Sequence, residues 1–373
     1  MVQKNNIKKS PHTFNDDKFP LLNKNNIDSC RYSNWYPKFE KNYAQYLVKS
    51  YIMNDIPESF VTFLLQDNIK LKYDGNLEFN DNDEFSDWSS DEESNDNSSD
   101  AADPISSYVD PAIDFFEVNN FISNSFKKSE KLTPRFNWSA PKDSVWILPY
   151  NNTMLTYTNE DVYLLLKGSN YIMHDLIYPY ENVKGAENGD VNNHSLILRE
   201  WIDDINPSME FRCFIKNGLI VGISQRDIRT EYCYLNDIVG DLKIKIENFV
   251  ESVFKPTFFD SEELEENGSE GQNAVIDMYL NLDTNYIKLI DVNPFCRSTE
   301  PLLFSWNELI TKNTKEDYEF RLGENNTKLG ARDHSENQIP LEIFDASLDP
   351  EKLRELTYEW SRLLSKQIKE EDC

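Results

Sequence analysis

The sequence is short of positive charge and of histidine, and each shortage argues against a class of function. Its 373 residues carry 38 Lys and Arg against 66 Asp and Glu, a formal net charge of −28. Nucleic acids and anionic membranes require a basic surface, so we expect neither as a partner. The charge favours a basic protein surface or a ligand whose charge a cation neutralises. With only four histidines, none in a triad-like context, hydrolysis by a Ser-His-Asp triad or by zinc is not expected.

Long apolar runs and several common motifs are missing as well. No run of about 18 apolar residues occurs, so no membrane span is expected, and residues 1–24 lack the apolar core of a signal peptide. The five cysteines form no C-x-x-C pair, which favours reduced thiols in a cytosolic or nuclear setting, and we predict a cytoplasmic protein. The motifs G-x-x-x-x-G-K-[ST], G-x-G-x-x-G, H-E-x-x-H and G-x-S-x-G do not occur.

Hydrophobic patterning predicts several elements. We expect helices over residues 57–65, 111–126 and 159–166, an amphipathic helix around 242–253 and another over 350–371. Strands are expected at 145–148 and 195–202. Asn217-Gly218 between two apolar runs predicts a hairpin of 210–216 with 219–225, with Gln225 opposite Glu210. Residues 1–29 are predicted to be a disordered extension, and the acidic stretch 76–103 a disordered insert or a docking segment for a basic partner.

The stretch Ala274–Phe295 carries the clearest candidate site. Residues 275–279 and 286–292 read as two strands joined by a turn near Thr284, which places Asp277 opposite Asp291. Facing carboxylates destabilise a strand pair unless something neutralises them. Asn293 falls on the same face as Asp291, and two carboxylates with one amide oxygen suit Mg²⁺ shared with a nucleotide phosphate. Two surface aspartates in an ordinary hairpin are the alternative.

A loop rich in aromatic residues forms a second candidate. Pro141 disfavours the helical conformation for Ala140, so residues 138–143 read as a loop. A basic residue stands at each end, Arg135 and Lys142, and such a pair could hold phosphates. A packed loop with two solvated cations explains the same pattern, and the sequence by itself favours that explanation.

Several blocks, in order, resemble one family, the cell-division-cycle protein 123 family, also called D123. No single block is as specific as the series, which spans about residues 30–310. The blocks are Cys30 with residues 33–37, then 137–143, 198–201, 210–214, 223–227, 291–295 and 302–306.

The resemblance implies an α+β fold of the ATP-grasp type, in which two lobes with antiparallel sheets clamp ATP. The first lobe would span 30–197 with the insert 76–103, and the second, carrying the Mg²⁺ site, 198–310. Residues 311–373 would form a C-terminal partner-binding region with a terminal helix. The implied metal ligands are Asp277, Asp291 and Asn293.

The resemblance also implies a set of nucleotide-binding residues. The hinge 198–201 would give adenine its backbone hydrogen bonds. Arg212, Ala140 and Lys142 would face phosphate, and Asp227 would lie near the ribose. This chain has Arg135 where the family commonly has lysine, which keeps the charge but not the shape of the group. The remaining residues of the implied set are Arg199, Glu200, Trp201 and Glu210.

The family acts as an assembly chaperone for eukaryotic translation initiation factor 2. It binds the γ subunit through that subunit's third domain and promotes joining of the α subunit. The resemblance therefore implies an ATP-binding chaperone, which we expect to be a monomer, and the acidic insert and residues 302–371 are candidates for the contact. One alternative is an ATP-grasp ligase that forms an acyl phosphate, so whether ATP is turned over stays open. A purely structural acidic adaptor is a third possibility.

Overall fold

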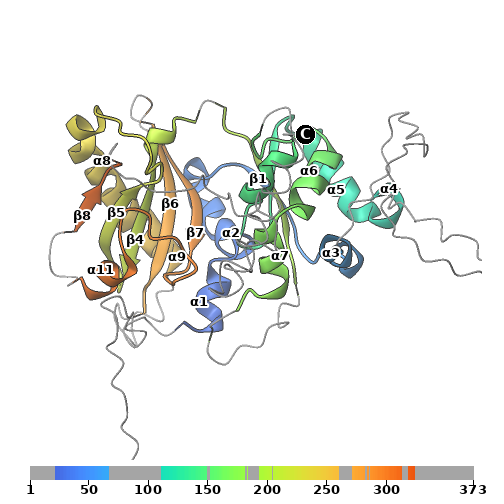
Figure 1. Ribbon diagram of the computed structural model, residues 1–373, viewed down its shortest axis with the longest axis horizontal. Helices are drawn as coiled ribbons and strands as arrows, with labels where there is room; N and C mark the ends of the chain where they lie inside the picture. Colours follow the sequence, from blue (N-terminus) through green and yellow to red (C-terminus); the bar gives the residue numbers. More distant parts are fainter. Residues whose placement is uncertain are drawn as a thin grey trace, which may run out of the picture.

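The computed structural model describes residues 22–66, 111–148, 152–180, 183, 193–203, 205–259, 271–281, 284, 286–312 and 318–323. These residues form two sheets flanked by helices, so the predicted α+β class with antiparallel sheets is confirmed (Figure 1). The ATP-grasp topology stays a prediction. The insert 76–103 and the helix predicted over 350–371 lie outside the described residues. Within those residues, every helix is too short or too polar to cross a bilayer.

The smaller sheet has three antiparallel strands in the order β1-β3-β2. They are β1 (Ser50–Met53), β2 (Leu132–Arg135) and β3 (Leu196–Glu200). Leu132, Leu196 and Leu198 pack with apolar side chains of four helices in one core. Those helices are α3 (Glu58–Leu65), α5 (Phe116–Phe126), which follows the short α4 (Pro111–Asp114), α6 (Asn159–Lys167) and α7 (Asn170–Ile177).

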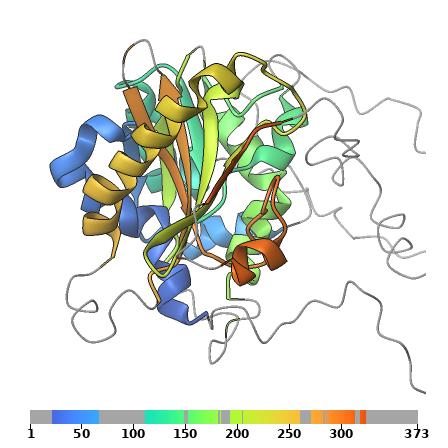
Figure 2. The same ribbon diagram turned by 90° about the vertical axis from the view of Figure 1, so that its left-hand side faces the viewer.

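The larger sheet has five strands in the order β7-β6-β4-β5-β8, and only the β5–β8 pair is parallel. The strands are β4 (Glu210–Lys216), β5 (Leu219–Gln225), β6 (Ala274–Asn281), β7 (Tyr286–Asn293) and β8 (Glu319–Arg321). Cys213 packs in the core that contains α8 (Leu235–Phe249), whereas its neighbour Phe214 packs with α11 (Trp306–Thr311). Because successive strand residues point to opposite faces, α8 and α11 cover opposite faces of this sheet (Figure 2).

The N-terminal helices join the core of the larger sheet. The helix α1 (Lys24–Ser29) begins with a capping box between Asn23 and Asn26, so the predicted disordered extension is wrong for these residues. The next helix, α2 (Tyr32–Tyr43), packs Trp35 and Phe39 into the larger-sheet core, and the Phe39 ring stacks on Phe254 with centroids 5.8 Å apart. Residues 30–43, which the predicted division gave to the first lobe, therefore pack with the other sheet (Figure 1).

Local signals predicted most elements correctly. The helices expected at 57–65, 111–126 and 159–166 are present, and Thr158 caps α6 in a box with Asp161. The helix expected around 242–253 spans α8, a π-helical turn η5 (Val250–Phe254) and α9 (Lys255–Phe258). Asn217 and Gly218 both have positive φ, 49° and 71°, as a tight hairpin turn requires.

Two expectations were wrong. A register shift between Phe214 and Ile215 places Gln225 opposite Phe211 rather than Glu210, because one strand carries an extra residue there. The strand expected at 145–148 is a 3₁₀ helix, η3 (Lys142–Ile147). The N–H of Ser144 donates to the carbonyl of Pro141 and the N–H of Leu148 to the carbonyl of Val145, both at 3.3 Å, while the Ser144 hydroxyl lies 2.7 Å from the carbonyl of Leu165.

Candidate functional site

A row of polar side chains crosses the larger sheet. Asp277 on β6 stands directly opposite Asp291 on β7, which confirms the predicted pairing, although a bulge between Asp277 and Met278 shifts the register nearer the turn. Arg212 on β4 is opposite Asp277, and Ser224 on β5 is opposite Arg212. Cross-strand partners share a face of the sheet, so these four side chains form one line, which we call the polar row. The two facing carboxylates therefore need neighbouring positive charge.

Arginines supply that charge to Asp277. The Nε and Nη2 atoms of Arg212 donate to Oδ1 and Oδ2 of Asp277 at 2.7 and 2.8 Å, and Nη1 of Arg226 donates to Oδ2 at 2.6 Å. Burial acts to raise the pKa of Asp277, but the two guanidinium groups outweigh it and hold the pKa well below its usual range. Asp277 is therefore a buried, ionised carboxylate whose oxygens are both engaged.

Asp291 is neutralised from the other sheet. Nη2 of Arg135, on β2, donates to Oδ1 of Asp291 at 2.9 Å, and the buried guanidinium lies 4.4 Å from the ring centroid of Tyr32. Oδ1 also accepts the N–H of Val292 at 3.0 Å. Among the described residues, Oδ2 of Asp291 accepts no hydrogen bond. The ion pair joins the two sheets, and Nη1 of Arg199 adds a second link by donating to the carbonyl of Ile290 at 3.1 Å.

The ammonium group of Lys142 forms no ion pair and no hydrogen bond with any described residue. The guanidinium of Arg226, together with burial, lowers the pKa of Lys142 to about 8, against the opposing effect of Asp277 and Asp291. Close positive charges and an unpaired ammonium are the arrangement that attracts an anion.

The site as a whole is cationic, although the chain has a net charge of −28. Five basic side chains, Arg135, Lys142, Arg199, Arg212 and Arg226, stand against four acidic ones, Asp277, Asp291, Glu210 and Glu300. Glu210 lies beside Arg226, with Oε2 3.9 Å from Nε. An excess of one positive charge in an acidic protein favours an anionic ligand at this place.

The donor set fits a divalent cation in part. Oδ2 of Asp291 accepts no hydrogen bond from the described residues, and the buried side-chain nitrogen of Asn293, two residues further along β7, has no partner either. These two side chains can turn oxygen atoms to a cation. Asp277 can join them only after a guanidinium has moved. Across the described residues, no three His, Cys, Asp or Glu side chains cluster closely enough to hold a metal by themselves.

Two other predicted site residues serve the local structure. Asp227 accepts the hydroxyl of Tyr232 at 2.8 Å and the N–H of Arg229 at 3.2 Å, so its carboxylate folds the loop after β5. The carbonyl of Ala140 accepts the N–H of Lys142 at 2.8 Å. Arg226 and Tyr32 belong to the site but were missed. Two sequence signals pointed to Arg226: its position next to Gln225 at the end of a strand, and its place within the block 223–227.

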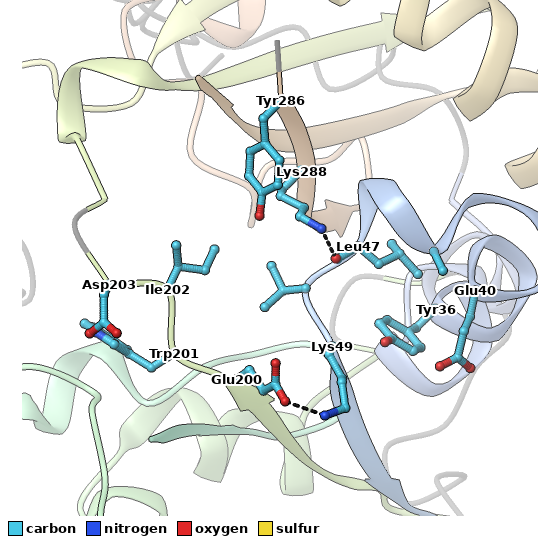
Figure 3. A pocket seen from close by; sticks show the side chains of 12 residues that line it. Tyr36, Glu40, Leu47, Lys49, Glu200, Trp201, Ile202, Asp203, Tyr286 and Lys288 are labelled. Atoms are coloured by element: carbon cyan, nitrogen blue, oxygen red, sulfur yellow. Dashed lines mark hydrogen bonds and ion pairs between the residues drawn. The ribbon is translucent and has the colours of Figure 1, made fainter. Parts of the chain in front are cut away.

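The predicted hinge borders a cavity of about 560 Å³ (Figure 3). Glu200 and Trp201 line it together with Leu47, Lys49 and Lys288, among others. The N–H groups of Glu200 and Trp201 donate to the carbonyls of Lys49 and Lys131 at 2.9 and 3.0 Å. Both amide groups are therefore engaged within the smaller sheet, and an adenine contact from this segment would fall to its carbonyl oxygens or to Ile202.

Two sheets that meet at a polar row surrounded by basic side chains define an α+β protein with a charged site at the junction of its sheets. The D123 family model matches residues 35–347, and the chain belongs to this family. The resemblance found in the sequence blocks is thereby confirmed.

Individual relatives are similar over nearly the whole chain. The translation initiation factor eIF2 assembly protein of Vanderwaltozyma polyspora is 41% identical over 378 residues, which cover 96% of this chain and 98% of the relative. Cell division cycle protein 123 of Candida glabrata is 40% identical over 357 residues, covering 92% of this chain and 94% of the relative. A solved structure of C-terminally truncated Cdc123 from Schizosaccharomyces pombe superimposes with a TM-score of 0.62 at 27% identity, covering 82% of this chain and 100% of that chain.

Proposed function

We propose that this chain is an assembly factor for translation initiation factor eIF2 that binds the γ subunit and promotes joining of the α subunit. One observation carries the proposal: a relative named for eIF2 assembly is 41% identical over 96% of this chain. The net charge of −28 is consistent with a partner that is basic on its surface.

We further propose that the chain binds Mg-ATP at the polar row, between the two sheets, in the manner of an ATP-grasp protein. The excess of basic side chains around Asp277 and Asp291 supports a triphosphate there. Lys142, Arg212 and Arg226 would face the phosphates, and Asp291 and Asn293 would hold the cation. When bound, the cation supplies the charge that offsets repulsion between Asp291 and the phosphate oxygens.

The contact between Lys142 and phosphate predicts a pH dependence. Because the pKa of Lys142 is lowered to about 8, its ammonium loses the proton as the pH rises from 7 to 9. The Kd for Mg-ATP should therefore rise by up to about tenfold over this range. The Lys142→Arg variant keeps its charge and should bind with an affinity that changes little over the same range. Isothermal titration calorimetry measures both series, and a flat profile for the wild type would remove Lys142 from the phosphate site.

Titrating Mg-ATP and purified γ subunit, separately and together, tests the proposed function. We expect each ligand to tighten the binding of the other by the same factor, since coupling between two binding sites is reciprocal. Unchanged affinity for γ with and without Mg-ATP would separate the nucleotide from the assembly role. ADP release in the same samples addresses the ligase alternative, which requires ATP consumption that rises with an added amine or carboxylate.

A further inference from the structure

The loop that carries Lys142 is fastened to helix α7 by a buried carboxylate. Asp175, on α7, is 3% exposed. Its Oδ2 accepts the backbone N–H groups of Trp138 and Ser139 at 3.0 and 2.8 Å, and its Oδ1 accepts the hydroxyl of Ser139 at 2.8 Å. Three donors from two consecutive loop residues therefore converge on one side chain.

A second carboxylate, which belongs to the loop itself, accepts hydrogen bonds from the start of α7. Asp143 is 2% exposed and follows Lys142 directly. Its Oδ1 accepts the hydroxyl of Ser169 at 2.5 Å, and its Oδ2 accepts the N–H groups of Asn170 and Tyr171 at 2.7 and 3.3 Å. These three residues form the cap and first turn of α7. The loop and the helix therefore hold each other on both sides of Lys142.

The contacts continue from the loop into the polar row. The carbonyl of Trp138 accepts a hydrogen bond from Nη2 of Arg135 at 2.6 Å, and Arg135 pairs with Asp291 at 2.9 Å. The backbone N–H of Trp138 thus donates to Asp175, and its carbonyl accepts from Arg135. A displacement of the loop would move both Arg135 and Lys142 relative to Asp291.

We infer that Asp175 is a positioning residue for the nucleotide site: through the loop it fixes Arg135 and Lys142 against the polar row without touching the ligand itself. This inference rests on the proposed binding of Mg-ATP. A site of this kind depends on a supporting layer of hydrogen bonds as much as on the groups that contact the ligand.

The geometry separates the role of shape from the role of charge at Asp175. An asparagine has the same shape: its Oδ1 can accept both N–H groups, and its Nδ2 can donate to the hydroxyl of Ser139. A glutamate keeps the charge but is one methylene longer, so it shifts the loop. Burial raises the pKa of Asp175, while its hydrogen bonds act in the opposite direction, so the negative charge itself is not favoured at this place. Shape is therefore the property that positions the loop.

The test compares Asp175→Asn, Asp175→Glu and Asp175→Ala in the full chain. Mg-ATP affinity is measured by calorimetry, and hydrogen exchange reports protection of the Trp138 and Ser139 amides. We expect Asp175→Asn to stay within about threefold of the wild-type Kd and to keep both amides protected. Asp175→Glu and Asp175→Ala should weaken binding by about tenfold or more and lose the protection. Thermal unfolding of each variant shows whether it is folded.

The Asn and Glu variants decide the matter even where Asp175→Ala does not fold. A folded Asp175→Glu that binds like the wild type, or an Asp175→Asn that binds as weakly as Asp175→Glu, would overturn the inference. Exchange protection lost without any change in Mg-ATP affinity would also overturn it, since Asp175 would then stabilise only the loop. A wild-type protein that does not bind Mg-ATP would instead reject the proposed function, and the inference with it.

Discussion

The Asp277→Ala substitution is expected to cause the largest loss of stability of any single change in the polar row, about 3–5 kcal/mol. Its carboxylate receives hydrogen bonds from Arg212 and Arg226. Removing it leaves the buried guanidinium of Arg212 without a carboxylate partner, and it leaves Arg226 with only the longer contact to Glu210, whose Oε2 lies 3.9 Å from Nε. Urea-induced unfolding, followed by circular dichroism, measures the change in the free energy of unfolding.

A surface pair provides the matched control for this prediction. Glu251 pairs with Lys255, one helical turn away, at 2.8 Å, but its side chain is 55% exposed. Glu251→Ala should therefore cost less than about 1 kcal/mol. Equal losses for the two variants would contradict the account, because burial would then have no part in the stability that Asp277 provides.

The dependence of stability on acidic pH follows from the ion pairs of Asp277. Because the pKa of Asp277 in the folded protein lies below its usual range, its contribution is complete above the unfolded-state pKa of about 3.9. The contribution is lost as the pH falls through the lower pKa of the folded state. The stability difference between wild type and Asp277→Ala should therefore be constant near neutral pH and shrink below about pH 4.

Asp291→Ala is expected to abolish Mg-ATP binding, raising the Kd by about 100-fold or more, and to weaken capture of the γ subunit. The substitution removes the only carboxylate oxygen of the Asp277–Asp291 pair that accepts no hydrogen bond from the described residues. Calorimetry with Mg-ATP and a pull-down with purified γ subunit measure the two effects.

Two further variants make this prediction specific. Asp291→Asn keeps an oxygen that accepts from Arg135 but removes the charge, so it should lose nucleotide affinity and part of the stability that the buried ion pair provides. Asp237→Asn, on α8 at the opposite face of the sheet, should match the wild type in both measurements. Wild-type affinity for nucleotide and γ subunit in Asp291→Ala would defeat the proposed site.

The sequence could predict the pairing of Asp277 with Asp291 but not what neutralises it. The two strands and the turn between them are local information, although the pairing also depends on a bulge between Asp277 and Met278 that the sequence did not indicate. The neutralising side chains come from β2, from β4 and from the residue after β5, and the contact of Arg135 with Asp291 joins positions 156 residues apart. The order of sheets that brings them together is set by tertiary packing, which short sequence patterns do not encode.

The errors have similar physical causes. Val145-Trp146-Ile147-Leu148 has the composition of a strand, yet the N–H of Leu148 donates to the carbonyl of Val145 at 3.3 Å and the segment forms part of a 3₁₀ helix. The predicted cross-strand partner of Gln225 was wrong by one residue, because a bulge leaves no clear mark in an apolar run. The packing of α2 against the larger sheet depends on contacts such as that between Phe39 and Phe254, which are 215 residues apart and invisible to a window of neighbours.

The location of the cation is the most direct test of the central claim, that Asp291 and Asn293 hold a divalent ion beneath a bound triphosphate. Mn²⁺ takes the same oxygen ligands as Mg²⁺ and scatters anomalously, so crystals grown with Mn²⁺ and a non-hydrolysable ATP analogue would show where it lies. The account predicts an anomalous peak within about 2.3 Å of a carboxylate oxygen of Asp291 and of the amide oxygen of Asn293. A nucleotide bound elsewhere, or a peak away from both side chains while Arg135 still pairs with Asp291, would contradict it.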